Sequence, residues 1–95
     1  MNLRGGIEMK IYNNIHSFIN DYYAKHPEGH YFDQDTLRFF GERLSDMRIN
    51  KTIEVKEDYR GEKHDCYVIS RMQRKHPNGP KRTLAYFDVE TLEDI

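Results

Sequence analysis

The chain of 95 residues is long enough for one small domain with a single hydrophobic core. Aromatic residues make up 13% of it and charged residues 33%, and a net charge of −1 argues against a disordered polyelectrolyte. No apolar run is long enough to cross a membrane and no signal peptide is recognisable, while the lone Cys66 excludes an internal disulfide framework. We therefore expect a cytoplasmic protein without a membrane partner, in which Cys66 is a core thiol.

The first residues, 1–8, have the sequence MNLRGGIE and precede any recognisable element. Arg-Gly-Gly is how a purine-rich ribosome-binding site reads when it is translated in frame, and Met9 follows shortly after. We expect residues 1–8 to be a disordered extension, with Met9 as the native start and residues 9–95 as a single α+β domain. The alternatives are an ordinary disordered N-terminus of the native protein and an RGG-type tail that contacts nucleic acid.

Two amphipathic helices are predicted in the first half of the chain. Apolar residues recur at helical spacing along one face of the first, which Pro27 and Gly29 stop: Ile11, Ile15, Phe18, Ile19 and Tyr22. The second is expected to start after Asp33 and to bury Leu37, Phe40, Leu44 and Met47. Gly41 lies on the same stripe, which indicates a close contact with another helix.

Two similar segments, YFDQDTL at 31–37 and YFDVETL at 86–92, are interpreted as helix starts. Asp33 and Asp88 are suited to cap the first turn, because a carboxylate accepts hydrogen bonds from free amides there. Phe32 with Leu37, and Phe87 with Leu92, have the spacing of a hydrophobic staple. A docking motif read by a partner is the alternative interpretation.

Three strands are predicted after Arg48, at 52–56, 64–73 and 83–87. The segment EDYRGEK reads as a hairpin turn and HPNGPK as a loop. The expected fold class is α+β: two N-terminal helices packed on a three-stranded antiparallel β-meander, with a short C-terminal helix (α-α-β-β-β-α). The predicted core consists of Ile15, Phe18, Ile19, Tyr22, Leu37, Phe40, Leu44, Ile53, Val55, Val68 and Leu84.

A basic hairpin is the strongest functional signal in the sequence. Five basic residues and no acidic one lie between Cys66 and Phe87, whereas four acids lie in the last eight residues. Strand pairing should bring the positive charges together, and such clustering usually implies an anionic partner. If its face is exposed, Tyr67 and Arg71 could stack on bases or on planar groups of a partner. The expected binding residues are Tyr67, Arg71, Arg74, Lys75, His76, Lys81 and Arg82. The alternative is a solvated hairpin whose charges pair with the acidic C-terminus.

Metal and catalytic interpretations have less support. His26 and His30 are four residues apart, but Pro27 and Gly29 break the helical geometry, and His64 with Cys66 forms only an H-x-C pair. Phosphate-binding glycine loops, activated nucleophiles and paired carboxylates are not recognisable. We therefore expect no metal, no cofactor and no catalytic residues.

Two resemblances add to this interpretation. RKHPNGPKRTLAYFDVETLEDI and YFDQDTLRFFG resemble small phage and mobile-element proteins of unassigned function, over most of the chain. Phage proteins of this size often inhibit host defence nucleases, as anti-CRISPR proteins do. About the last 45 residues, with a YRG turn, three strands and a Phe-Asp helix start, resemble AP2 domains and the arm-binding domains of phage integrases. Those domains lay a three-stranded sheet in the major groove, but here the final helix is shorter and two helices precede the sheet.

The expected function is that of a non-enzymatic binding protein, encoded by a phage or mobile element. Its basic hairpin would engage nucleic acid or the acidic surface of a host nucleic-acid-handling protein. The alternative is a structural or oligomeric interaction module that binds through its aromatic surface. A small zinc protein or enzyme is the third possibility.

Overall fold

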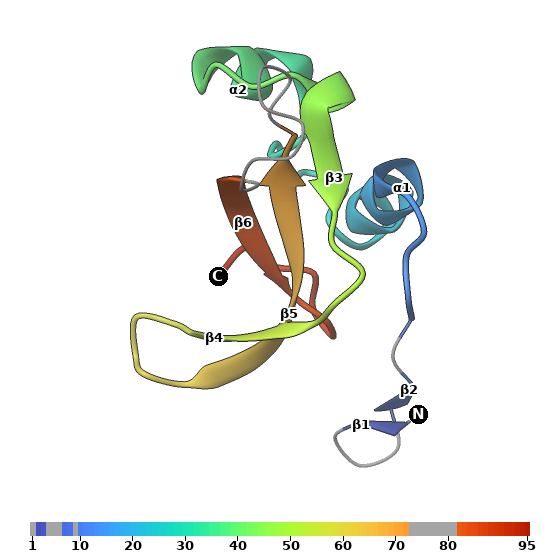
Figure 1. The fold of residues 1–95 in the computed structure, drawn as a ribbon, viewed down its shortest axis with the longest axis vertical. Helices are drawn as coiled ribbons and strands as arrows, with labels where there is room; N and C mark the ends of the chain where they lie inside the picture. Colours follow the sequence, from blue (N-terminus) through green and yellow to red (C-terminus); the bar gives the residue numbers. More distant parts are fainter. Residues whose placement is uncertain (1, 4–6, 9, 73–81) are drawn as a thin grey trace.

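The computed structural model describes residues 2–3, 7–8, 10–72 and 82–95. Figure 1 shows an antiparallel sheet with helix α1 against one face and helix α2 near one end of the central strand. The fold is therefore a small α+β domain, as the sequence predicts. Its helices are α1 (Ile15–Lys25), α2 (Gln34–Phe39) and the short 3-10 helix η1 (Leu44–Asp46). Its strands are β1 (Asn2–Leu3), β2 (Ile7–Glu8), β3 (Met47–Ile49), β4 (Glu54–Glu57), β5 (Lys63–Arg71) and β6 (Arg82–Asp88).

Strand β5 is the centre of the main sheet, and every pairing in the sheet is antiparallel. Strand β6 pairs with one edge of β5. The other edge is shared, because β3 pairs with the C-terminal part of β5 and β4 with its N-terminal part. The three predicted strands are thus present, and β3 is a fourth strand, whose first residue, Met47, the sequence analysis assigned to the second helix. Strands β1 and β2 form a separate two-stranded sheet.

Helix α1 begins at an N-cap that the sequence analysis did not identify. The Asn14 side chain accepts a hydrogen bond of 3.0 Å from the backbone N–H of Ser17, so the helix starts at Ile15. Ile11 therefore precedes the helix and is exposed. The helix ends at Lys25, in agreement with the stop predicted from Pro27 and Gly29.

Helix α2 is shorter than predicted because Gly41 ends it. The backbone N–H of Gly41 bonds to Arg38 and that of Glu42 bonds to Leu37, and Gly41 has a φ of 72°. This is a Schellman motif, the common left-handed end of a helix. The predicted helix contact at Gly41 is wrong, since none of the described residues beyond its chain neighbours lies within 4 Å of a Cβ placed there. Phe40 therefore follows the helix and is exposed.

The predicted C-terminal helix is also wrong. Asp88 does cap a turn, with its Oδ1 accepting hydrogen bonds from the N–H groups of Glu90 and Thr91. Leu92 then takes a left-handed φ of 56°, and the chain folds back so that Asp94 pairs with Phe87. Leu92 is buried in this arrangement, so the fold-back adds an apolar side chain to the core.

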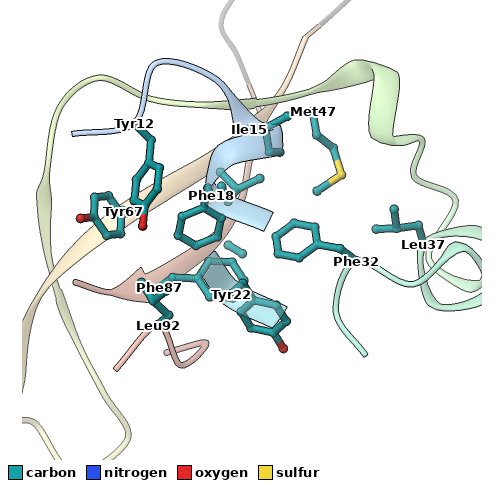
Figure 2. Packing of buried hydrophobic residues seen from close by; sticks show 12 residues of the cluster. Tyr12, Ile15, Phe18, Tyr22, Phe32, Leu37, Met47, Tyr67, Phe87 and Leu92 are labelled. Atoms are coloured by element: carbon teal, nitrogen blue, oxygen red, sulfur yellow. The ribbon is translucent and has the colours of Figure 1, made fainter. Parts of the chain in front are cut away.

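The hydrophobic core lies between α1 and the sheet and is mainly aromatic (Figure 2). Phe18 is fully buried at its centre. Its ring makes edge-on contacts, with centroids 5.2–6.0 Å apart, to four other rings: Tyr12, Phe32, Tyr67 and Phe87. Such contacts add to the stabilisation that burial of the rings provides.

The predicted core is partly confirmed. Ile15, Phe18, Tyr22, Leu37 and Val68 are buried, and Ile19, Leu44, Ile53 and Leu84 are partly buried. Phe40 and Val55 are exposed, so their assignment to the core is wrong. All four residues of β4 are exposed because the β4–β5 hairpin extends beyond the region that α1 covers (Figure 1). Cys66 is buried, as predicted.

Candidate nucleic-acid interface

The predicted basic hairpin is described only at its base. Arg71 at the end of β5 pairs in register with Arg82 at the start of β6. Arg74, Lys75, His76 and Lys81 lie outside the described residues. The strand pairing therefore brings two of the predicted arginines to one end of the sheet.

Arg71 and Arg82 differ in their surroundings. Arg71 Nη1 lies 3.4 Å from both carboxylate oxygens of Glu42, which partly offset its charge. Arg82 is exposed and has no ion pair with any other residue in the described part of the chain. Arg82 is thus the better placed of the two to contact an anionic ligand.

Tyr67 is not a surface residue. Its ring is 3% exposed and contacts Tyr12 and Phe18, and its hydroxyl donates a hydrogen bond to the backbone carbonyl of Lys10. The core covers this face of β5, so the expected stacking of Tyr67 with Arg71 on an outside partner is wrong.

Two exposed aromatic residues lie beside this end of the sheet instead. Phe39 is 83% exposed and Phe40 is 67% exposed, and their rings meet edge-on with centroids 5.1 Å apart. The sequence analysis placed Phe40 among the buried residues of a longer second helix. Gly41 was the signal that could have shown otherwise, because a glycine after the last helical turn commonly ends the helix.

The end of α2 lies between two surface hollows. One, of about 340 Å³, is lined by Leu37 of α2, by residues on either side of that helix and by β6: Tyr31, Leu37, Phe40, Glu42, Arg82, Thr83 and Leu84. The second, of about 780 Å³, also includes Leu37 and Glu42, so it adjoins the first: Phe32, Gln34, Leu37, Arg38, Gly41, Glu42, Arg43 and Leu44. We refer to the exposed residues Arg38, Phe39, Phe40, Arg43 and Arg82 as the aromatic–basic edge.

Tyr31 supplies a neutral polar group to the first hollow. Burial, with smaller contributions from the charges of Asp94 and Glu42, raises the pKa of Tyr31 to about 12. Its hydroxyl therefore stays protonated at neutral pH and can both donate and accept a hydrogen bond.

The four groups considered as zinc ligands in the sequence are not brought together. His26 Nε2 lies 2.6 Å from the backbone oxygen of Thr91, and His30 Nδ1 lies 2.8 Å from Asp33 Oδ2. Cys66 lies in β5 and its side chain is fully buried. His64 is at the β4–β5 hairpin, where it contacts two aspartates.

The protein is thus a small α+β domain that exposes a pair of aromatic rings and several arginines on its surface. Searches of protein-family models, of curated proteins and of solved structures found no match to the chain. Within the described residues, neither helix is long and apolar enough to span a membrane.

Proposed function

We propose that this domain binds single-stranded nucleic acid at the aromatic–basic edge. The observation that carries the proposal is the exposure of the Phe39–Phe40 pair, of which Phe40 lines a hollow together with Arg82. Exposed aromatic rings are stacking platforms for unpaired bases, and arginines beside them contact phosphates. Duplex DNA does not offer its base faces, so the aromatic pair favours a single strand.

The charges near this edge support the same proposal. Arg38, Arg43 and Arg82 are exposed, and the sequence adds Arg74, Lys75 and Lys81 between β5 and β6. A nucleic-acid strand whose bases stack on the two phenylalanines would pass the base of the β5–β6 hairpin. Phosphate contacts would then supply affinity and bases would supply only a modest sequence preference.

The test is the binding of fluorescently labelled oligothymidine to the full chain, followed by anisotropy. Replacing Phe39 and Phe40 by alanine should remove about 1–3 kcal/mol per stacked base, which is at least about fivefold in affinity for each base. Arg82→Glu should also weaken binding. The matched controls are Val55→Ala and Lys63→Glu, which change an exposed apolar and an exposed basic residue on the β4–β5 hairpin. Equal binding by the wild type and the double alanine variant would reject the stacking role.

The same exposed phenylalanines favour a second candidate, a protein-interaction module. Two large apolar rings on one surface are typical of contacts between proteins. An acidic surface of a nucleic-acid-handling protein would fit the arginines as well, in line with the resemblance to small phage proteins, which at this size often inhibit host defence nucleases. In that case, salt should act mainly on the association rate, and oligothymidine should not compete.

A further inference from the structure

The turn between β4 and β5 brings together three side chains of the types that bind metal ions. One ligand atom from each of Asp58, Glu62 and His64 lies within 4.8 Å of the other two. Figure 1 shows this turn at the opposite end of the sheet from α2, so the cluster is separate from the aromatic–basic edge.

Backbone hydrogen bonds hold one oxygen of Asp58 and leave the other directed at His64. Asp58 Oδ1 accepts from the N–H groups of Arg60 and Glu62, at 2.8 and 3.0 Å. The backbone N–H of Asp58 also bonds to the carbonyl of Glu62, which closes the turn. Asp58 Oδ2 is thereby placed 2.8 Å from His64 Nε2.

A second aspartate orients the imidazole from the opposite side. Asp88 Oδ2 lies 2.8 Å from His64 Nδ1, and its other oxygen is held by backbone N–H groups of the following turn. The Asp88 side chain is only 4% exposed. A carboxylate that holds one imidazole nitrogen in this way fixes the ring and directs the other nitrogen to a metal ion.

We propose that Asp58, Glu62 and His64 bind one divalent transition-metal ion, with Zn²⁺ as the best fit, and that Asp88 is a positioning residue for His64. An imidazole nitrogen with two carboxylates suits zinc, whereas magnesium and calcium prefer oxygen ligands alone. Ligand atoms around tetrahedral zinc lie about 3.4 Å apart, so the exposed Glu62 side chain must close inward. The ion would displace the proton between His64 Nε2 and Asp58, and three protein ligands would leave its fourth position to water.

The experiment uses the full chain, stripped of metal with a chelator and titrated with zinc chloride in a calorimeter. The wild type should bind one zinc ion per chain and melt at a higher temperature when zinc is present. Asp88→Asn should weaken binding about 10–100-fold. Glu62→Gln removes a ligand without removing the His64–Asp58 contact, and should weaken binding at least as much.

The matched control is His30→Gln, which removes another imidazole that lies 2.8 Å from an aspartate. It should bind zinc like the wild type. Failure of the wild type to bind zinc stoichiometrically, equal binding by Glu62→Gln, or tighter binding of magnesium chloride would overturn the proposal. The role of His64 would then be to form ion pairs with Asp58 and Asp88 and not to bind a metal ion. If Asp88→Asn does not fold, Glu62→Gln still decides between these outcomes.

Discussion

The Tyr23 hydroxyl donates a hydrogen bond of 2.5 Å to Asp33 Oδ1, and so ties the end of α1 to the start of α2. His30 contacts the other carboxylate oxygen at 2.8 Å. The hydrogen bond from Tyr23, followed by that from His30, holds the pKa of Asp33 below its usual value of 3.8. The ionised carboxylate of Asp33 is therefore the form that the folded protein stabilises.

We expect Tyr23→Phe to lower the melting temperature at neutral pH. Because the pKa of Asp33 is lowered in the folded state, this contribution is present above about pH 3.8 and is lost as the pH falls through the lowered value. The difference in melting temperature between wild type and variant should therefore shrink in acid. Tyr59→Phe, at a 90% exposed ring, is the control and should have little effect. A difference that does not change with pH would point to packing instead of the hydrogen bond.

Phe18→Ala should be among the most destabilising single substitutions in the core. The ring is fully buried and contacts four other aromatic rings, so its loss leaves a cavity and should cost about 3–5 kcal/mol. Val55→Ala, at an exposed position of β4, should change the free energy of unfolding by less than about 0.5 kcal/mol. Urea denaturation of both variants measures these values, and similar costs would contradict the observed core.

Gly41→Ala should destabilise the protein by about 1–2 kcal/mol, because φ at this position is 72° and only glycine adopts that conformation without strain. Gly41→Asn should cost less, since asparagine tolerates the left-handed region better. If Gly41 lay inside a regular helix, its replacement by alanine would instead stabilise the protein, by about 1 kcal/mol. Thermal or urea unfolding gives the sign of the change in the free energy of unfolding for Gly41→Ala, and this sign shows whether α2 ends at Gly41.

The elements that the sequence predicts correctly are those whose signal is local. Strand β5 is rich in β-forming residues, and Pro27 with Gly29 marks the end of α1 whatever the rest of the chain does. The helix start at Asp33 is also correct, although no hydrogen bond from its side chain caps α2. The Asp33 carboxylate could accept hydrogen bonds either from the first amides of α2 or from Tyr23, and the local sequence does not show which of these donors it binds.

The features that the sequence misses depend on distant parts of the chain. Met47 has the spacing of a helical core residue, yet it lies in β3 because β5 offers an unpaired edge. Tyr67 and Val68 point to opposite faces of β5, and both are buried, so alternation along the strand does not show which face is accessible. The aromatic–basic edge depends on where α2 ends relative to β6, which only the three-dimensional structure provides.

Removal of residues 1–8 should have little effect on stability. Figure 1 shows β1 and β2 paired with each other, apart from the main sheet, and the chain reaches the core at Tyr12. A chain that begins at Met9 should therefore melt at nearly the same temperature as the full chain. Tyr12→Ala is the contrasting variant, because it removes a buried ring and the hydrogen bond of 2.6 Å from its hydroxyl to Asp21. Clear destabilisation by the truncation alone would show that residues 1–8 contribute to the fold.

Glu42→Gln should strengthen the binding of single-stranded nucleic acid if the aromatic–basic edge is its site. The carboxylate of Glu42 lies between the two surface hollows and 3.4 Å from Arg71, so it repels phosphate and partly neutralises that arginine. Loss of one negative charge about 8 Å from a phosphate is worth about 0.5 kcal/mol in water, or about twofold in affinity. Release of Arg71 for one more phosphate contact should steepen the log–log dependence of affinity on salt by about 0.7. Glu57→Gln, at an exposed acid on β4, removes the same charge far from this edge and should change neither quantity. Oligothymidine anisotropy over a range of salt concentrations measures both, and equal effects of the two substitutions would indicate a general change in net charge and no local site.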